Sequence, residues 1–464
     1  MPTPSLPAAR RGRHVFLFAV ALVPALVAAE ARAQQQPPVR IPALAAPMSD
    51  SATGRPITLS EAIATAQRNA PSAIQAQGQV RAGATSVRAA RAAFIPNVNL
   101  STGLTRQNNV ATRVNPTTGE LSSNRYQSTT SLSASLDLFD GFRRINDLKA
   151  ARAQENAAET GVSATNANLA FSVKQQYYAA LAARESEVAA QAQLAQAEQQ
   201  LALSIAKLHA LTATRSDSLR GVIAVSQAQL ALLQARNNRA TADAALTRVI
   251  GSDVPVSATP TGLTADTAFV ALDSAQLAAL AQDNPNIRSA QASLEAARFS
   301  YRSARGAYYP TVSLSYGRNL SSSNNSFDPF GSDYTTSGNF RLNVGLPLYN
   351  QFNRERTIIN AGIAASNAEA SLRDQQLLAQ QSLVQAITAL RTAQQQIVLQ
   401  QQSVAAAEED LRVQQERYQL GVSTLLDVLT SQTQLNNARL ALVQARFSAR
   451  TARAQLEQLV GRDL

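Results

Sequence analysis

Two kinds of pattern alternate along the chain, and their order predicts a mainly helical protein with a few strands. Stretches rich in Ala and Gln have the pattern of long helices, in which small and amide side chains pack closely and leave the opposite face wet. These stretches cover about 58–93, 142–209, 215–250, 273–307, 353–419 and 424–459. The openings Thr58-Leu-Ser-Glu61 and Asp273-Ser-Ala-Gln276 fit a capping box, which begins a helix. We therefore predict two very long helices, each accompanied by two shorter ones.

Short stretches in which apolar and polar residues alternate predict two β-hairpins. Pro96 and Pro310 stop the helical pattern, and alternation follows each of them. The expected strands of the two hairpins are, in chain order, about 97–107, 126–138, 310–320 and 337–349. One face of each strand is mainly aliphatic or aromatic, whereas the other carries mainly Ser, Asn and Gly. This alternation is typical of strands that are apolar on one side and wet on the other, as in membrane barrels.

The chain is one structural unit written twice. The sequence SVRAARAAFIP at 86–96 recurs 214 residues later, at 300–310, as SYRSARGAYYP. The sequence LALLQAR at 230–236 recurs 210 residues later as LALVQAR. A repeat of this length is too long for a solenoid unit and indicates duplication of a whole half. We therefore predict, in order, an N-terminal segment at 34–57, a first repeat at 58–250, a linker at 251–271 and a second repeat at 272–461.

The first 33 residues have the form of a signal peptide. Arg10, Arg11 and Arg13 precede an apolar run of 15 residues from Val15 to Ala29, and Ala31-Arg32-Ala33 has the small-x-small form of a cleavage site. An N-terminal membrane helix is the weaker interpretation, because spanning takes about 20 apolar residues. No later helical stretch is apolar enough to span a bilayer. We expect an exported protein whose membrane contact comes from strands.

Helix lengths predict how the elements are arranged. The first long helix has about 68 residues, or roughly 100 Å at 1.5 Å per residue. The two shorter helices of the same repeat have about 34 and 36 residues, so laid end to end they match the long one. Four strands that are apolar on one face cannot close into a barrel, and open edges in lipid are costly. Other copies of the chain must complete the sheet: two copies give eight strands, and three give twelve.

Composition removes several classes of function. The 464 residues include 42 Lys and Arg against 31 Asp and Glu, but the basic residues are scattered, so we expect no nucleic-acid partner. There is no Cys, and one of the two His, His14, lies in the export signal. Metal sites built on His or Cys and thiol chemistry are therefore excluded. His209 has no acid and hydroxyl beside it in the sequence, so we interpret it as a helix-end residue. We expect no enzyme activity, no cofactor and no metal site.

The chain resembles the TolC family of outer-membrane efflux proteins over nearly its whole mature length. The resemblance rests on the duplicated layout, on Ala92-Ala-Phe-Ile-Pro96 before the first hairpin and on Leu136-Asp-Leu-Phe-Asp-Gly141 after it. The most specific match is Tyr418-Gln-Leu-Gly-Val-Ser-Thr-Leu-Leu-Asp-Val-Leu429. The resemblance implies a mainly α fold with a β-barrel part, in which a homotrimer forms a twelve-stranded outer-membrane barrel continuous with a periplasmic α-helical barrel.

The same resemblance implies a function, and one alternative function is also considered. The family serves as a passive exit duct in efflux or type I secretion, and it works with a periplasmic adaptor, an inner-membrane transporter and outer-membrane lipid. We expect this chain to lie in the outer membrane and to extend into the periplasm. The alternative is a periplasmic coiled-coil adaptor or scaffold protein. That alternative predicts one helical hairpin flanked by small globular β-domains, whereas this sequence has two helical hairpins, each preceded by a strand pair.

Candidate functional residues lie at the two ends of the predicted helices. Asp217 and Asp427 each follow a Thr by three residues, which fits a helix N-cap, and the resemblance adds a gate role. The turns are expected to dock the adaptor through Leu420, Gly421, Val422, Thr212, Ala213 and Thr214. At the strand ends we favour a membrane-interface girdle over ordinary packing for Phe94, Phe139, Phe142, Tyr308, Tyr309, Tyr349 and Phe352.

The turn sequences depart from the family pattern at three positions. Leu211 stands in the first turn where the second has Gly421, and we expect Gly421 to take the left-handed conformation at a helix end. Better-studied relatives carry a basic residue at the position of Ser423 and an acid at that of Thr430. Locking of the gate is therefore expected to differ in this chain.

Overall fold

A computed structural model of the chain describes residues 54–108, 113–114, 121–122, 125–210, 212, 214–260, 279, 281–324 and 334–461. The expected signal peptide lies outside these residues. Counted together with the flanking strands β1 and β6, which lie outside the predicted bounds 58–250, the first repeat comprises β1 (Arg55–Ile57), α2 (Leu59–Asn69), α3 (Pro71–Ala92), β2 (Asn97–Arg106), β3 (Arg113–Val114), β4 (Leu121–Ser122), β5 (Tyr126–Phe139), α4 (Arg143–His209), α5 (Arg215–Ile250) and β6 (Val256–Ala258). The second comprises α7 (Pro285–Arg305), the 3-10 helix η1 (Gly306–Tyr308), β7 (Thr311–Asn324), β8 (Thr335–Gly345), α8 (Asn353–Gln419) and α9 (Leu425–Val460).

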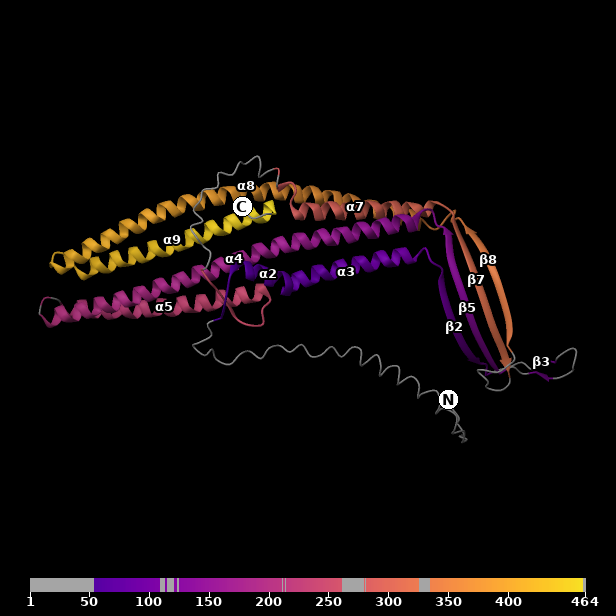
Figure 1. Cartoon of the computed structure of the whole chain (residues 1–464), viewed down its shortest axis with the longest axis horizontal. Helices are drawn as coiled ribbons and strands as arrows, with labels where there is room; N and C mark the ends of the chain where they lie inside the picture. The colour runs from indigo at the N-terminus through magenta and orange to yellow at the C-terminus, as the bar shows by residue number, and fades with distance from the viewer. Residues whose placement is uncertain are drawn as a thin grey trace, which may run out of the picture. The chain divides into compact units, whose positions relative to one another are not determined.

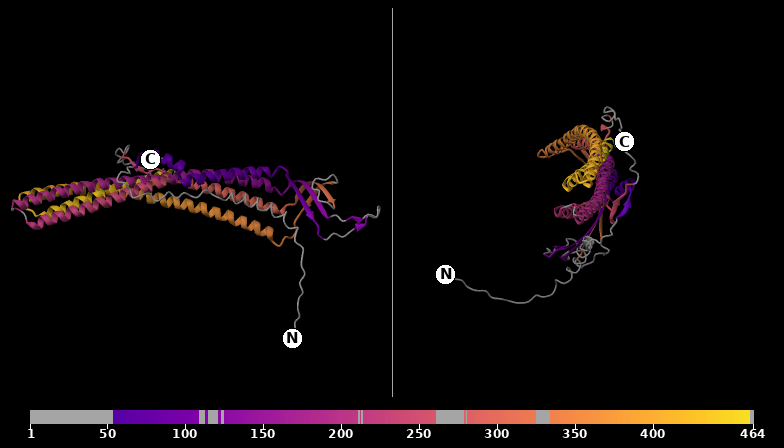
Figure 2. Two further views of the ribbon diagram at one scale, coloured as in Figure 1. Left: turned by 90° about the horizontal axis from the view of Figure 1, so that it is seen from below. Right: turned by 90° about the vertical axis from the view of Figure 1, so that its left-hand side faces the viewer.

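Each long helix is matched by two shorter ones. Helices α4 and α8 both have 67 residues, as predicted to within a residue. Near the strands α4 packs against α3 and α7, and toward the turns it packs against α5 and α9 (Figure 1). Seen end-on, the helices of residues 54–461 lie in one curved layer (Figure 2). No helix within the described residues is both long and apolar enough to cross a membrane.

The prediction of one helix over 58–93 is wrong, because Pro71 divides it. Ala70 is extended, with φ −63° and ψ 135°, and α3 begins at Pro71. A residue before proline avoids the helical region, and proline has no N–H to continue the preceding helix. The second repeat has the same break, since α7 begins at Pro285, 214 residues after Pro71. The expected earlier start at 273–276 lies outside the described residues.

The hairpins join into one antiparallel sheet with the strand order β2-β5-β7-β8. Strands β2 and β8 are therefore its edges. Strand β7 continues to Asn324, beyond the predicted end near 320. Strand β8 ends at Gly345, so the prediction that it reaches 349 is wrong. Pro347 follows two residues later and has no N–H to donate to a ladder.

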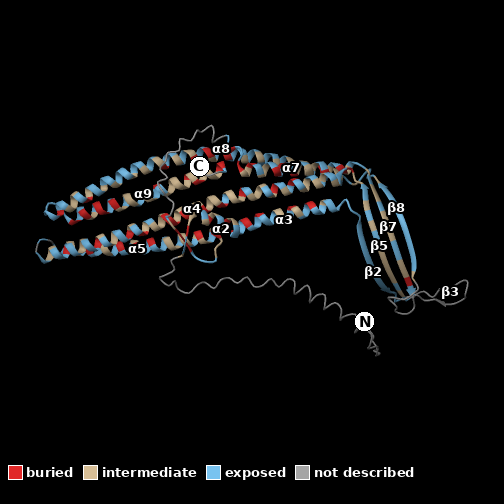
Figure 3. Cartoon of the chain, in the orientation of Figure 1, coloured by how far each residue is buried: buried red, intermediate tan, exposed pale blue. Residues whose placement is uncertain are grey.

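The register confirms that one face of the sheet is apolar. Val98, Ala134, Tyr316 and Phe340 lie opposite one another across all four strands. Phe340 is 77% exposed, and most strand positions are exposed or intermediate (Figure 3). Such exposure of large apolar side chains marks a surface that another apolar phase or another chain covers.

A second, two-stranded sheet packs against α4 in the middle of the first repeat. Strands β1 and β6, which sequence analysis left without a predicted element, pair in parallel. Tyr177 of α4 is 1% exposed, and its hydroxyl lies 2.6 Å from the carbonyl oxygen of Thr259 and 3.2 Å from that of Ile57. The largest apolar cluster of the described residues surrounds this contact and includes Leu169, Val173, Leu246 and Ile250.

Buried apolar clusters lie within single repeats, whereas polar side chains form bonds between the two repeats. Each of the four buried apolar clusters draws its residues from one repeat only. Between the repeats, Lys174 of α4 makes an ion pair of 2.6 Å with Glu457 of α9. Near that pair, the Gln458 amide donates to Asn168 at 2.6 Å. Polar side chains therefore fix the alignment of two halves that carry separate apolar cores.

Candidate functional site

The turns at the ends of the long helices repeat one capping arrangement. In the first turn, the Thr214 hydroxyl accepts from the N–H of Asp217 at 3.3 Å, and the Asp217 carboxylate accepts from the N–H of Thr214 at 3.1 Å. In the second turn, Thr424 and Asp427 make the same two bonds at 3.3 and 2.9 Å. These reciprocal bonds satisfy free N–H groups at the start of α5 and α9, as a capping box does. The capping role predicted for both acids is confirmed.

Asp427 has one hydrogen-bond donor that Asp217 lacks in the described contacts. The Ser423 hydroxyl lies 3.0 Å from Asp427 Oδ2, where the Thr424 hydroxyl also donates at 2.7 Å. Hydrogen bonds from Thr424 and then from Ser423 lower the pKa of the Asp427 carboxyl, and the charge of Arg417 lowers it further. Asp427 is exposed and therefore keeps its negative charge over a wide range of pH.

Gly421 has the left-handed conformation expected of it, with φ +78°. The N–H of Val422 bonds to the carbonyl of Arg417 at 2.9 Å, and the N–H of Gly421 bonds to that of Tyr418 at 3.2 Å. This is the Schellman pattern, which satisfies the last carbonyls of α8. A Cβ on Gly421 would meet no atom within 4 Å, so only its backbone conformation requires glycine.

The first turn closes on a similar bond. The N–H of Thr212 bonds to the carbonyl of Lys207 at 2.9 Å, and the Thr212 hydroxyl donates to the same oxygen at 3.1 Å. Leu211 and Ala213 lie outside the described residues. The described part of the first turn therefore ends α4 with a bond of the same span as the one from Val422 to Arg417.

A lysine that sequence analysis did not single out joins the two turns. Lys207 near the end of α4 donates to the carbonyl of Tyr418 at 2.8 Å, and its ammonium lies 3.9 Å from the centre of the Tyr418 ring. Burial raises the pKa of Tyr418, and the nearby Asp217 carboxylate raises it further. Lys207, Asp217 and Tyr418 are therefore close, although they come from different repeats.

Apolar side chains are exposed at the second turn. Leu420 is 79% exposed, Val422 67% and Leu426 53%. Leu420 and Val422 flank Gly421, and Leu426 lies in the first turn of α9. The ends of α8 and α9 that this turn joins lie far from the strands (Figure 1). The turn therefore combines a hydrogen-bonded backbone with exposed aliphatic side chains, which suits docking of another apolar surface.

The predicted aromatic residues gather where strands meet helices. Rings of Phe139 and Phe142 lie 5.3 Å apart, Phe142 and Tyr309 6.2 Å apart, and Tyr349 and Phe352 5.9 Å apart. The exposed fractions of Phe94, Phe142, Tyr308, Tyr309, Tyr349 and Phe352 run from 42% to 73%, and Phe139 is half-buried. The structure thus places these rings in separate groups at the strand–helix junctions, and their role at a membrane interface stays a prediction.

Two equivalent arginines hold these junctions. The Arg144 guanidinium bonds to Asp140 at 3.1 Å and to the carbonyls of Ala93 and Leu138 at 3.3 Å, and it lies over the Phe94 ring. Arg354, 210 residues later, bonds to the carbonyl of Pro347 at 3.1 Å and lies over a tyrosine ring. Each arginine ties a strand end to the helix that follows it.

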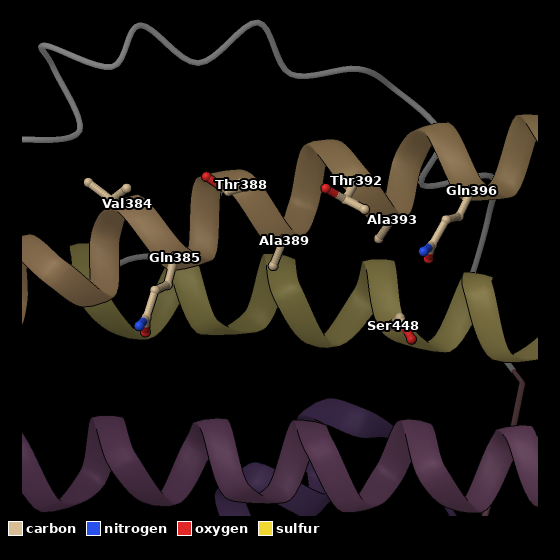
Figure 4. A pocket seen from close by; sticks show the side chains of 8 residues that line it. All are labelled: Val384, Gln385, Thr388, Ala389, Thr392, Ala393, Gln396 and Ser448. Carbon is tan, nitrogen blue, oxygen red and sulfur yellow. The ribbon is translucent and has the colours of Figure 1, made fainter.

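A shallow groove of about 560 Å³ runs along α8 beside α9 (Figure 4). Hydroxyl, amide and aliphatic side chains line it, namely Val384, Gln385, Thr388, Ala389, Thr392, Ala393, Gln396 and Ser448. None of these residues titrates near neutral pH, so the groove offers no general acid or base.

Comparison with known proteins agrees with this architecture. The sequence pattern of the family described as "Outer membrane efflux protein" matches residues 62–252 and 277–462. The family pattern thus matches the chain twice, once in each half.

Individual relatives span most of the chain. Protein CyaE of Bordetella pertussis is 28% identical over 389 residues, which are 82% of this chain and 79% of that protein. The outer membrane efflux protein BepC of Brucella suis is 25% identical over 87% of this chain and 85% of its own length.

Solved structures share the fold at lower identity. The outer membrane protein VceC of Vibrio cholerae matches with a TM-score of 0.70 at 20% identity, over 87% of this chain and 96% of that one. The MtrE outer membrane channel of Neisseria gonorrhoeae, solved in its open state, matches with a TM-score of 0.69 at 21% identity, over 88% and 89%. The family match over both repeats, together with two strand pairs in one sheet, excludes the adaptor alternative. The chain belongs to the outer membrane efflux protein family, and it is a non-enzymatic efflux channel of the outer membrane that extends into the periplasm.

Proposed function

We propose that three copies of this chain form one continuous exit duct, through which molecules delivered by an inner-membrane transporter leave the cell. The observation that carries the proposal is the four-stranded sheet, which has an exposed apolar face and two edges, β2 and β8, without a partner strand in the described chain. Unpaired backbone in lipid is costly, so β8 of one copy pairs with β2 of the next. Three copies give twelve strands around a lumen lined by Ser, Asn and Gly.

The helices support the same assembly. Helix α8 lies at one border of the curved layer, and α3 and α5 lie at the other (Figure 2). Large aliphatic side chains are exposed on α8 at Ile359, Ile363, Leu377, Val384 and Leu399, and on α5 at Leu219, Ile223, Leu230 and Leu233. Contact between α8 of one copy and α5 of the next would bury both sets, and burial of apolar surface stabilises association.

The turns supply docking and gating. The exposed side chains of Leu420 and Val422 beside Gly421, together with Thr212, Ala213 and Thr214, receive the helical hairpins of a periplasmic adaptor. Asp427, repeated three times around the axis, forms an anionic ring at the periplasmic mouth, and Asp217 adds to it. Fixed carboxylates in such a constriction favour cations. The contact of Lys207 with Tyr418 holds the two turns of each copy together while the mouth is closed.

The assembly is tested by mass and by a matched pair of lysine substitutions. The detergent-solubilised protein should have the mass of a trimer. Phe340→Lys places a charge on the apolar face and should cost about 2–4 kcal/mol per copy if that face meets the bilayer centre. The neighbouring Asn339→Lys lies on the opposite face of β8 and should insert normally. The readout is the amount of heat-modifiable trimer in the outer-membrane fraction.

Two results would contradict the proposal. A stably inserted monomer would show that the sheet closes without other copies. Normal insertion of Phe340→Lys would show that the apolar face does not meet lipid.

A further inference from the structure

One arginine of the inner strand β7 stands on the apolar face of the sheet. Along β7 the residues of that face are Val312, Leu314, Tyr316, Arg318 and Leu320. Arg318 pairs with Leu132 of β5 on one side and with Gly338 of β8 on the other. Its side chain is exposed. A guanidinium is therefore held on the face that otherwise meets hydrocarbon.

The chain supplies no counter-charge for Arg318 among the residues that the structure describes. Its same-face neighbours are Tyr316 and Leu320 along the strand and Leu132 and Gly338 across it, and none is acidic. Arg318 makes no hydrogen bond or ion pair with any described residue. Asp137, the acid of β5, lies on the opposite, polar face, because it pairs with Ser313.

A neighbouring copy would not supply the counter-charge either. Strand β7 is an inner strand, so a second copy adds its strand beyond β8. The apolar face of the edge strand β2, which would lie there, carries Val98, Leu100, Thr102, Leu104 and Arg106. An anion that pairs with Arg318 therefore lies outside the described residues and outside the apolar face of the strand that a neighbouring copy would add.

The height of Arg318 on the strand indicates where such an anion lies. Toward the helices, the next row on this face carries Ala134, Tyr316 and Phe340, and the row beyond it carries Leu136, Leu314 and Leu342. Away from the helices, the next row carries Leu320 among the three threonines Thr102, Thr130 and Thr336. The row beyond it carries Leu104 beside Ser128 and Ser322, and the Ser128 hydroxyl lies 3.3 Å from the hydroxyl of Tyr334. Arg318 thus marks the boundary between the aliphatic band and a hydroxyl-rich rim. Because the helices extend into the periplasm, this rim lies at the outer leaflet.

The surroundings leave room for a ligand beside the guanidinium. Gly338, directly opposite, has no side chain. A Cβ placed there would meet only the carbonyl oxygen of Gly317 at 3.7 Å and the hydroxyl of Tyr316 at 3.8 Å. The long arginine stem can lie along apolar surface while its charged end reaches the polar rim. The space over Gly338 therefore offers a guanidinium and a phenolic hydroxyl as donors.

We propose that Arg318 binds a phosphate group of lipopolysaccharide, the phosphorylated glycolipid of the outer leaflet. The planar guanidinium donates two parallel hydrogen bonds to phosphate, and the lipid environment that makes an unpaired charge unfavourable strengthens such a pair. The inference rests on the proposed trimeric barrel, in which each copy contributes one such site on the lipid face. The site would anchor the barrel to the outer leaflet at a fixed height.

Native mass spectrometry of the detergent-solubilised protein tests this proposal, with diphosphoryl lipid A as the probe. The parent protein should bind lipid A with up to one molecule per copy. Arg318→Leu should weaken binding about tenfold or more, because it removes a charge-assisted bond, and Arg318→Lys should fall between the two. Arg341→Leu is the matched control, because Arg341 pairs with Ser315 on the polar face of the same sheet.

The same spectra separate the failure of this inference from failure of the assembly. A parent protein that is not a trimer would contradict the proposed duct. A trimer in which Arg318→Leu binds lipid A as well as the parent would contradict the site alone. Equal binding of phosphatidylglycerol, or displacement of lipid A by millimolar inorganic phosphate, would show that the site does not select the glycolipid and would overturn its assignment.

Discussion

The turns that end α4 and α8 derive from one duplicated sequence, yet they now hold their acids differently. Both have a Thr and an Asp that form a capping box. Around Asp427, the Ser423 hydroxyl adds a further donor, and Gly421 closes α8 in the left-handed conformation. Asp217 instead lies near Tyr418 of the other repeat and contributes to its raised pKa.

This difference distinguishes the cap residues, which helix formation requires in both turns, from the residues beside the cap, which can differ between the turns. Every helix start has free N–H groups, so the Thr and Asp of the cap serve a purpose wherever α5 and α9 begin. No such requirement fixes the residues beside the cap. The second turn has therefore acquired an exposed apolar tip and a well-solvated acid, whereas the first supplies the lysine that holds the two turns together.

Among substitutions that test the difference between the two turns, replacement of Gly421 should have the largest effect on export. Gly421→Val forces a β-branched residue to φ +78°, at a cost of roughly 1–2 kcal/mol, which lowers the equilibrium constant for forming the native turn about 5–30-fold. Export of a fluorescent pump substrate should fall accordingly, while the trimer stays intact. The control is Gly78→Val in α3, where a Cβ also meets no atom within 4 Å and the conformation is helical. Normal export by Gly421→Val would argue against this turn as the docking surface.

Removing the lysine that joins the turns should have the next largest effect. Lys207→Met keeps the apolar stem but loses the bond to the Tyr418 carbonyl and the cation–π contact, worth about 0.5–2 kcal/mol. The mouth should open more often, so single-channel conductance in planar bilayers should rise several-fold. His209→Met, two residues away at an exposed position, should conduct as the parent does. Equal conductance of Lys207→Met and His209→Met would remove Lys207 from the closing mechanism.

Substitution of the two acids, Asp217 and Asp427, should change the ion selectivity of the channel to different extents. Asp427→Asn should reduce the cation preference of the channel, and Asp217→Asn should reduce it less, because its carboxylate lies beside the tyrosine contact. The effect should shrink as salt rises, since exposed charges are screened over about 10 Å at 0.1 M. Reversal potentials in a salt gradient measure both variants. If Asp427→Asn keeps the selectivity of the parent, capping is its whole role.

The smallest expected effect concerns the pH dependence of Asp427. A carboxyl whose pKa is lowered in the folded state stays charged, and stabilises the fold, until the pH falls through that lowered value, below the ordinary pKa of about 3.9. Selectivity and the helix cap should therefore persist on mild acidification and be lost only below it. Ser423→Ala removes one donor, so the midpoint of the loss should move to higher pH. Thr433→Ala, whose hydroxyl bonds only to Leu429 of its own helix, should leave the midpoint unchanged.

Local sequence features predicted most of the helices and caps. The patterns that predicted 142–209 and 353–419 correspond to α4 and α8 within one residue, because long Ala-rich stretches have few competing conformations. The Thr-x-x-Asp caps and the conformation of Gly421 were predictable for the same reason, since each depends on residues within a single turn. Pro71 is a local signal for a helix break, but helical periodicity on both sides of it led to the prediction of one continuous helix.

Contacts between distant residues were not predictable from one sequence. Lys207 and Tyr418 are 211 residues apart, and no local sequence pattern at either residue indicates that they are in contact. Strands β1 and β6 have three residues each, too few to show alternation. Arg318 differs, because its place in the alternation of β7 is visible in the sequence. Only the register showed that it faces Leu132 and Gly338 without an acid.

The separate apolar clusters have a consequence for how the exported chain folds. The largest cluster requires residues up to Ala258 and none from the second repeat. Its widest closure, from Arg55 to Val256, costs little more entropy than a shorter one, because that cost grows only with the logarithm of loop length. The first repeat can therefore condense while the second is still emerging from the inner membrane. A chain truncated after residue 260 retains every partner of this cluster and should show cooperative unfolding of its own.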